Sequence, residues 1–325
     1  MTETALDTDV LVIGLGPGGA SAAATAAAAG LKVIGIDRKR QFGQPVQCAE
    51  FVPLPMGRYA RPQGVLAQSI TGMQTFLPSG AATETDFPGL MIDRARFDQA
   101  IVERAREAGA TVFSGTRLGV LDPEARSAWL ERDDRRQLVR YRLLIAADGP
   151  ASSVAQALGL PRLKTVNTRQ YTVPLRRSYT DTDIWVGDEF PGGYGWLFPK
   201  GEVANIGLGA DRRWQADLKT PLDRLHRQLV DQGLVGETIL ARTGGLIPVG
   251  GLRSRLVCGD VLFVGDAAGL THPITVAGIS AAEIGKAVNV SDAAAVVERI
   301  EICIGADRDY VRAFQGRGCD GTEKT

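Results

Sequence analysis

The glycines at positions 14, 16 and 19 form the first pattern with a chemical consequence. The hexapeptide Gly14-Leu15-Gly16-Pro17-Gly18-Gly19 fits G-x-G-x-x-G, follows a short apolar run and opens an alanine-rich segment. In such a loop the first glycine permits a tight turn, the second lets the backbone approach a pyrophosphate, and the third lets the helix pack on the strand. The free N–H groups of the helix N-terminus attract the phosphates.

An aspartate ends the next apolar run. Asp37 can accept hydrogen bonds from the ribose of an adenosine. Arg38, the next residue, is also predicted to bind the cofactor. Two further aspartates stand at the ends of later apolar runs, in Asp148-Gly149 and in Gly265-Asp266. A strand that delivers a carboxylate at its end, followed by small residues, lets that carboxylate meet a ribityl hydroxyl at close range. The first fingerprint fits NAD as well as FAD, whereas the three segments in this order indicate FAD.

Tyr194, Trp196 and Phe198 alternate along the chain. In a strand these three side chains would share one face. Three aromatic rings on one wall suit an apolar substrate that lies beside a flavin. The alternative is that the stripe belongs to the core.

Cys48 lies in an irregular stretch, residues 41–63, which four prolines interrupt. Its ordinary pKa of about 8.5 keeps a thiol mostly protonated at neutral pH, which suits a proton donor. A free cysteine is also commonly a small buried hydrophobe, so both interpretations stay open.

The segment 271–279 leads into a predicted helix whose N–H groups could face the pyrimidine edge of a flavin and stabilise its reduced form. His272 could donate a proton there, or it could be a structural loop histidine. Pro273 is expected to shape the loop.

The periodicity of the remaining chain predicts the elements that position these residues. Residues 10–13, 20–29 and 31–36 form a β-α-β unit, which implies a parallel sheet. The further expected elements are a helix over 97–108, strands at 110–113, within 116–147 and at 257–264 with a break at 259–260, a β-rich region over 168–210, and helices over 222–232 and from 281.

These elements predict an α/β fold. A Rossmann-type FAD-binding domain is expected over residues 1–60, 90–165 and 250–290, and it is interrupted by a β-rich substrate lobe of α+β character. The lobe is expected over 61–89 and 166–249, and a short helical C-terminal segment over 291–325.

The order of the three nucleotide segments resembles that of the aromatic-hydroxylase-like flavoproteins. Two other segments are similar to the geranylgeranyl reductases within that superfamily. Residues 190–199 read Phe-Pro-Gly-Gly-Tyr-Gly-Trp-Leu-Phe-Pro, which matches the Tyr-x-Trp-x-Phe-Pro signature of that family. Residues 45–50 read Pro-Val-Gln-Cys-Ala-Glu and resemble its cysteine-bearing loop. The resemblance covers about residues 8–285, and the Tyr-Trp-Phe-Pro element is its most specific part.

The resemblance implies further FAD contacts and places Cys48 beside the flavin ring, where it could donate a proton to a substrate carbon. Arg94 precedes a predicted helix and suits a pyrophosphate, although a solvated charge at a helix start would look the same. The contacts that the resemblance implies are Pro17, Gly18, Asp37, Cys48, Ala49, Arg94, Leu118, Asp266, Gly278 and Ile279. Relatives usually continue through a longer helical C-terminal region, so we expect a smaller substrate here or a pocket that another subunit closes.

The leading hypothesis is a flavin-dependent reductase that transfers hydride from reduced FAD to a C=C bond of an isoprenoid or similar apolar substrate, with Cys48 or a bound water as the proton donor. One alternative is a single-component FAD monooxygenase acting on an aromatic substrate. A second alternative is a non-catalytic flavin electron-transfer partner. No second G-x-G-x-x-G follows a strand, so the reductant is expected to be a transient NAD(P)H or a ferredoxin.

Composition places the chain among ordinary globular proteins. It has 325 residues with 37 basic and 37 acidic side chains, a balance that gives no reason to expect nucleic acid. Four cysteines without a CxxC pair and two histidines argue against a structural metal site.

No signal peptide or membrane-spanning run is visible, which favours a cytoplasmic protein and leaves a peripheral membrane contact open. The sequence does not indicate the oligomeric state.

Overall fold

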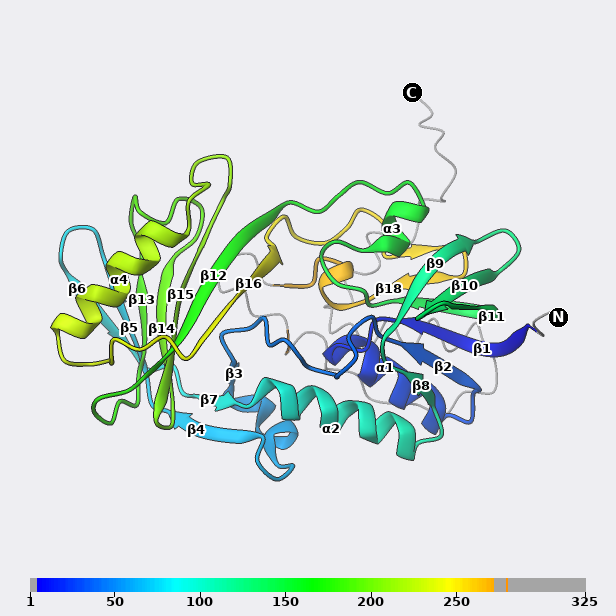
Figure 1. The fold of residues 1–325 in the computed structure, drawn as a ribbon, viewed down its shortest axis with the longest axis horizontal. Coiled ribbons are helices and arrows are strands. Elements are labelled where there is room, and N and C mark those ends of the chain that lie inside the picture. Colours follow the sequence, from blue (N-terminus) through cyan, green and yellow to red (C-terminus); the bar gives the residue numbers. More distant parts are fainter. Residues whose placement is uncertain (1–4, 272–278, 280–325) are drawn as a thin grey trace. The chain divides into compact units, whose positions relative to one another are not determined.

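The structure, a computed structural model, describes residues 5–271 and residue 279 (Figure 1). The helix expected from residue 281 and the segment 291–325 lie outside the described residues. The chain divides into two compact units. The first unit takes residues 1–44, 98–163 and 248–325, and the second takes 45–97 and 164–247. The expected mixed α/β fold is confirmed.

The first unit is built on an eight-stranded sheet whose central strands are parallel. Strand β1 lies between β2 and β11, β2 pairs with β8, and β11 pairs with β18, all in parallel. These strands are β1 (Leu6–Ile13), β2 (Val33–Ile36), β8 (Thr111–Phe113), β11 (Arg135–Ala146) and β18 (Val261–Phe263). The antiparallel additions are β9 (Thr116–Asp122), β10 (Ser127–Arg132) and β17 (Val257–Cys258). The break predicted at residues 259–260 is the turn between β17 and β18.

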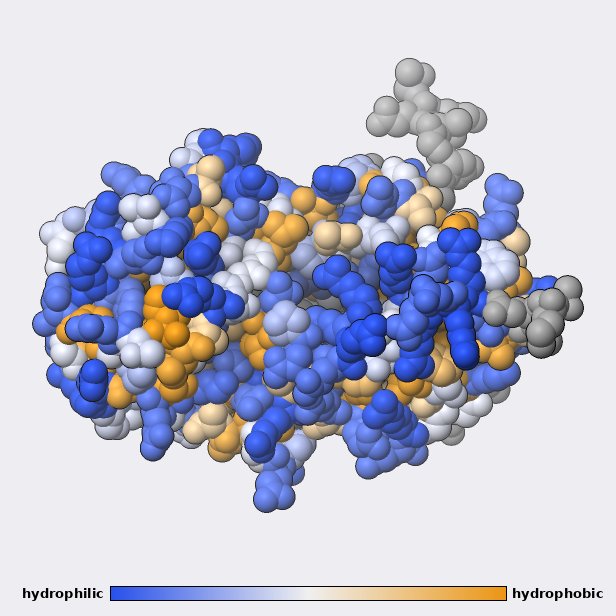
Figure 2. All heavy atoms as spheres, in the orientation of Figure 1, coloured by the Kyte–Doolittle hydropathy of each residue, from blue (hydrophilic) through white to orange (hydrophobic). Residues whose placement is uncertain are grey.

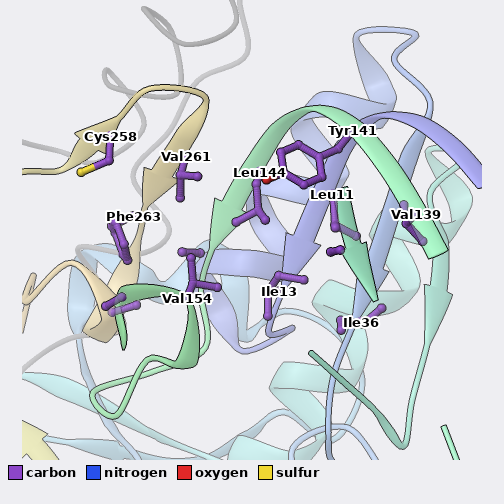
Figure 3. Packing of buried hydrophobic residues seen from close by; sticks show 14 of the residues in the cluster. Leu11, Ile13, Ile36, Val139, Tyr141, Leu144, Val154, Cys258, Val261 and Phe263 are labelled. Atoms are coloured by element: carbon purple, nitrogen blue, oxygen red, sulfur yellow. The ribbon is translucent and has the colours of Figure 1, made fainter. Parts of the chain in front are cut away.

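The helices of this unit are α1 (Pro17–Ala28), α2 (Arg94–Glu107), whose first turn belongs to the second unit, α3 (Ser153–Ala157) and the short 3₁₀ turn η2 (Gly265–Ala267). The core joins β1, β11 and β18 to α3. Figure 3 shows Leu11, Leu144, Phe263 and Val154 among its side chains, and all four are fully buried. A strand buried on both faces reads as a continuous apolar run, which is why β1 and β11 were recognisable in the sequence.

The second unit holds a seven-stranded sheet in the order β16-β12-β15-β14-β13-β5-β6. Its strands are β5 (Met73–Phe76), β6 (Ala82–Thr85), β12 (Thr165–Pro174), β13 (Thr182–Trp185), β14 (Gly195–Lys200), β15 (Val203–Ala210) and β16 (Ala241–Pro248). A smaller sheet joins β3 (Phe51–Pro53), β7 (Gly89–Ile92) and β4 (Leu66–Ile70), next to the 3₁₀ helix η1 (Leu54–Ala60).

The large sheet of the second unit has two different faces. One face packs against α4 (Lys219–Asp231), which lies along the sheet in Figure 1, and this layer contains Tyr171, Leu197, Ile206 and Leu225. Side chains alternate along a strand, so their neighbours in sequence point to the other face. The other face therefore carries Gln170, Trp196, Phe198 and Asn205.

The unit boundaries differ from the expected domain boundaries at residues 60/61 and 89/90. Strand β3 pairs with β7, which pairs with β4. Residues 45–60 and 90–97 therefore belong to the second unit, and the cysteine-bearing loop goes with them.

Strand β13, which pairs with β14, contains a buried carboxylate that makes a testable contribution to stability. Asp183 is 3% exposed and accepts a hydrogen bond from the Tyr179 hydroxyl at 2.6 Å. Burial raises the pKa of Asp183 to about 6, and the nearby Asp181 adds to the rise, while the Tyr179 hydrogen bond opposes it. The folded state therefore binds this proton more tightly than the unfolded chain, so ionised Asp183 destabilises the fold above about pH 6 and the penalty fades towards pH 4.

We expect Asp183→Asn to raise the free energy of unfolding by about 1–3 kcal/mol at pH 8 and to give little gain near pH 4. Urea denaturation at the two pH values measures this difference. The exposed Asp188 provides a control, because Asp188→Asn should have little effect on the free energy of unfolding at either pH. A gain that is independent of pH would contradict the assignment.

Candidate functional site

The glycine loop after β1 has no room for side chains at two of its positions. Gly14 has a φ of +96°, and a Cβ there would lie 2.3 Å from the carbonyl oxygen of Ala147 at the end of β11. A Cβ on Gly19 would lie 1.9 Å from the carbonyl oxygen of Gly14. The loop therefore turns tightly between two strands and helix α1 packs directly on it.

Gly16 differs from both, because a Cβ there would meet nothing within 4 Å. Gly16 is the N-cap of α1, Pro17 and Gly18 begin the helix, no side chain caps it, and its first turn holds no acidic residue. Uncapped N–H groups and a positive helix end attract an anion. The open side of Gly16 thus faces a space that suits a phosphate.

Asp37 follows β2 and lies beside this loop. Its Oδ2 accepts a hydrogen bond from the Leu15 N–H at 2.9 Å, and its Oδ1 accepts one from the Lys39 N–H at 2.8 Å. Asp37 is half-buried, and these two backbone donors hold its carboxylate in place. The side chain of Arg38, the next residue, is exposed. Each oxygen keeps further acceptor capacity for a sugar hydroxyl.

Asp148 follows β11 and has one oxygen in use and one without a partner. Its Oδ2 accepts from the Ser153 N–H at 2.6 Å, the Ser153 hydroxyl at 2.8 Å and the Val154 N–H at 3.1 Å, all at the start of α3. Its Oδ1 is buried and has no hydrogen-bond partner among the described residues. Buried acceptors are almost always satisfied, so this oxygen indicates a missing donor. Gly149 beside it has a φ of +83° and open space around it.

The third aspartate, Asp266, lies in η2 after β18 and accepts a hydrogen bond from the Thr271 hydroxyl at 2.5 Å. Gly265 before it has a φ of +57°. An arginine that the sequence did not identify holds this segment. Arg253 is 7% exposed, and its Nε donates to the Ala267 carbonyl at 2.5 Å while its Nη1 donates to the Pro161 carbonyl at 2.6 Å. No periodicity marks a buried arginine in a loop, which is why it was missed.

Together, the opening at Gly16, the uncapped start of α1, and the unsatisfied Asp148 oxygen lie at the same carboxyl edge of the parallel strands β1, β2 and β11. That edge is where open α/β sheets bind nucleotides. The donors, acceptors and space there fit FAD.

The other predicted cofactor residues are distributed over the chain. Leu118 lies on β9 and packs, half-buried, against the core of the first unit. Cys48, Ala49 and Arg94 belong to the second unit. Ile279 is half-buried, and His272, Pro273 and Gly278 lie outside the described residues.

The aromatic alternation produces the expected shared face. The Tyr194 and Trp196 ring centroids lie 6.0 Å apart at 69°, and those of Trp196 and Phe198 lie 6.5 Å apart at 37°. Tyr194 immediately precedes β14, and Leu197 points into the core under α4. Two rings that the sequence did not identify extend the stripe, because Phe51 lies 5.9 Å from Phe198 and Phe87 lies 5.7 Å from Phe51. We name this set the aromatic row: Tyr194, Trp196, Phe198, Phe51 and Phe87.

Two glycines make room for the aromatic row. A Cβ on Gly207 would lie 2.4 Å from Cζ2 of Trp196, and one on Gly89 would lie 2.3 Å from the Phe51 ring. The rings of Trp196 and Phe51 therefore lie directly against the backbone of β15 and β7. Glycine inside a strand often marks such a close approach, and this signal was present in the sequence.

Gly207→Ala is expected to displace the Trp196 ring and to destabilise the protein by about 1–3 kcal/mol, because a methyl group would overlap the indole. The emission spectrum of Trp196, in a background where the other three tryptophans are phenylalanine, and the free energy of unfolding measure the two effects. Gly209→Ala on the same strand is the matched control, since the nearest atom to its Cβ would be Cγ2 of Thr168 at 3.5 Å, an ordinary contact distance. Equal behaviour of the two variants would refute the steric role of Gly207.

Cys48 is half-buried beside two groups of opposite charge. Its Sγ accepts a hydrogen bond from the Glu50 N–H at 3.2 Å, and the Arg94 guanidinium lies beside it. Burial raises the pKa of the Cys48 thiol above its ordinary value, although Arg94 and the Glu50 N–H act to lower it. The thiol thus stays protonated at neutral pH, and the same two donors stabilise a thiolate once the proton has left.

Gln170, which was not identified from the sequence, links the backbone of Cys48 to the aromatic row. Its Nε2 donates to the Cys48 carbonyl at 3.1 Å, and its Oε1 accepts from Nε1 of Trp196 at 3.1 Å. Gln170 is 4% exposed, so both ends of its amide are satisfied in a dry environment. The cysteine loop and the ring of Trp196 therefore share one rigid support.

Two negative findings hold for the described part of the chain. It contains no cluster of three or more His, Cys, Asp or Glu side chains placed to bind a metal. It also contains no helix long and apolar enough to span a bilayer.

Comparison with known proteins bears on both units. The family model of the geranylgeranyl reductase catalytic domain matches residues 165–246, and that of an FAD binding domain matches residues 84–190. A digeranylgeranylglycerophospholipid reductase of Methanopyrus kandleri is 36% identical over 84% of this chain and 74% of its own length. The chain belongs to the geranylgeranyl reductase family. A second relative, the digeranylgeranylglycerophospholipid reductase of Methanocaldococcus jannaschii, is 31% identical over 83% of this chain and 73% of its own length.

A solved structure supports the same family membership. The geranylgeranyl bacteriochlorophyll reductase-like protein of Thermoplasma acidophilum superimposes with a TM-score of 0.79 and 26% identity, over 96% of this chain and 81% of that one. A myxobacterial chondrochloren halogenase reaches a TM-score of 0.71 at 17% identity, which is a likeness of fold alone. This geranylgeranyl reductase family member is thus an FAD-dependent oxidoreductase, and the predicted family and cofactor are confirmed.

Proposed function

We propose that the protein reduces C=C bonds of the geranylgeranyl chains of an isoprenoid glycerophospholipid. The observation that carries the proposal is the aromatic row joined to the Cys48 loop through Gln170. Gln170 and the row's members Tyr194, Trp196 and Phe198 lie within residues 165–246, which match the geranylgeranyl reductase catalytic domain. The two relatives above act, by name, on digeranylgeranylglycerophospholipid. A row of five aromatic rings suits a long unsaturated hydrocarbon chain.

In this proposal the glycine loop, Asp37 and Asp148 would hold FAD, which when bound and reduced would supply hydride to one alkene carbon. The other alkene carbon takes a proton from Sγ of Cys48. Arg94 and the Glu50 N–H stabilise the thiolate, which is reprotonated from solvent before the next turnover. The aromatic row orients the chain and excludes water from it.

The second proton donor and the electron donor in this proposal rest on the sequence alone. His272 is a second candidate for the proton donor. The electrons that restore reduced FAD come from NAD(P)H or from a ferredoxin. A lipid substrate also favours peripheral contact with a membrane. Figure 2 shows hydrophobic residues among hydrophilic ones on the face in view. Trp214, Leu240 and Leu54 are among the most exposed large hydrophobic residues of the described part of the chain. Singly exposed apolar residues are common on soluble surfaces and do not identify the membrane-facing side.

The test is an anaerobic single turnover. The full chain loaded with FAD is reduced with dithionite, freed of excess reductant and mixed with digeranylgeranylglycerophospholipid in detergent micelles. We expect flavin oxidation and a lipid product heavier by two hydrogen atoms for each bond reduced. An absolute requirement for oxygen, with a hydroxylated product, would instead support the monooxygenase alternative. No reaction with or without oxygen would support the electron-transfer alternative.

A further inference from the structure

A buried carboxylate lies beside Cys48 and has no role in the function proposed so far. Glu50 is 4% exposed. Its Oε2 accepts from Nζ of Lys200 at 2.7 Å and from Nδ2 of Asn205 at 2.8 Å, and its Oε1 accepts from the Arg94 N–H at the start of α2 at 2.9 Å. A carboxylate that accepts from three donors in a buried position is fixed in orientation.

The backbone of Glu50 is equally constrained. Its φ is +72°, a left-handed conformation that is strained for a residue with a side chain. In that conformation its N–H donates to Sγ of Cys48, and its carbonyl accepts from the Ile92 N–H at 2.9 Å. The turn that presents the thiol therefore depends on the conformation of this one residue.

Two of the three donors to the Glu50 carboxylate come from β14, which carries part of the aromatic row, and from its neighbour β15. Lys200 ends β14, the strand of Trp196 and Phe198, and Asn205 of β15 pairs with Phe198. Nδ2 of Asn205 also lies 3.3 Å from the Ala49 carbonyl. The carboxylate thus ties the cysteine loop to the proposed substrate wall at a second point, separate from Gln170.

We propose that Glu50 is a positioning residue for the Cys48 thiol, and that its ion pair with Lys200 both anchors the cysteine loop to β14 and offsets the charge of the carboxylate beside the thiol. This inference rests on the proposed role of Cys48 as proton donor. The charged groups that act on Cys48 are Arg94, which favours the thiolate, and Glu50, which disfavours it. Lys200 acts through Glu50.

Glu50→Gln and Lys200→Met both remove the ion pair between Glu50 and Lys200, but we expect them to shift the pH midpoint of Cys48 alkylation in opposite directions. Glu50→Gln removes the negative charge, so the pH midpoint of Cys48 alkylation should fall by about one unit. Lys200→Met leaves the carboxylate uncompensated, so the midpoint should rise by a similar amount. Asn205→Asp, which adds a carboxylate beside Glu50, should also raise it. A merely structural contact would give shifts of one sign, because both of the first two variants loosen the same loop.

The measurement uses the FAD-loaded full chain and iodoacetamide, with the rate followed on the Cys48 peptide by mass spectrometry, which separates it from the other three cysteines. Glu103→Gln is the control, because Glu103 is an exposed carboxylate paired with Arg106 on α2 and should leave the midpoint unchanged. Circular dichroism and bound FAD establish that each variant folds. If Glu50→Gln does not fold, the Lys200→Met and Asn205→Asp shifts decide the question.

Shifts in the same direction for Glu50→Gln and Lys200→Met, or no upward shift in Lys200→Met and Asn205→Asp, would overturn the proposal. Alkene reduction at the full rate by a Cys48→Ser variant would overturn the role of Cys48 as proton donor. That result would not change the alkylation midpoints measured for the Glu50, Lys200 and Asn205 variants. The two failures are therefore distinguishable.

Discussion

Cys48→Ser is expected to lower the rate of alkene reduction by about 100-fold or more, while FAD stays bound. A serine hydroxyl occupies nearly the same space and can accept the Glu50 N–H, but it is a far weaker acid than a thiol. Removing a positioned general acid typically costs two to four orders of magnitude in rate. The rate of flavin oxidation in an anaerobic single turnover with the lipid substrate measures the effect.

Two comparisons make this result specific. Cys258 is buried in the core of the first unit, so Cys258→Ala should leave the rate of flavin oxidation unchanged even if it lowers stability. A Cys48→Ser enzyme that keeps the full rate would show that a bound water or His272 supplies the proton.

Gly16→Ala is expected to weaken FAD binding by about 10- to 100-fold without destabilising the protein that lacks the cofactor. The structure offers the new methyl group open space, and the backbone of Gly16 has an ordinary φ of −69°. The methyl group would instead occupy the side on which a pyrophosphate must approach, and forced overlap of this kind costs about 1–3 kcal/mol. Titration of the protein with FAD, followed by flavin fluorescence, gives the dissociation constant.

The control for this variant is another glycine with ordinary geometry. A Cβ on Gly187 would meet only Cγ of Pro78, at 3.7 Å, so Gly187→Ala should bind FAD as the unaltered protein does. If Gly16→Ala retained full FAD affinity, the opening at Gly16 would not be the phosphate site.

The features that the sequence made visible are those that depend on residues close together in the chain. The glycine loop needs only a turn and a helix start, and the aromatic stripe needs only the two-residue period of a strand. A local signal was overlooked at α2, which begins three residues before the predicted start. Asp93 caps it by accepting the Arg96 N–H at 3.0 Å, and an aspartate before a helical pattern is a recognisable cap.

The support of the cysteine loop could not be predicted in the same way. The Glu50–Lys200 pair joins residues 150 positions apart, and Gln170 lies 122 positions from Cys48. Which polar side chains meet across such separations depends on strand order and register, and a single sequence does not state either. Phe51 and Phe87 were missed for the same reason, since only the pairing of β3 with β7 brings Phe51 to the stripe on β14.

The aromatic row changes character along its length. Trp196 is 5% exposed, whereas Phe87, at the far end, is 38% exposed. A hydrocarbon tail that lies along this gradient would lose its hydration one isoprene unit at a time, and each unit would add its own increment of free energy. Affinity would then increase with the number of isoprene units in the tail, so shorter isoprenoids would bind more weakly in regular steps.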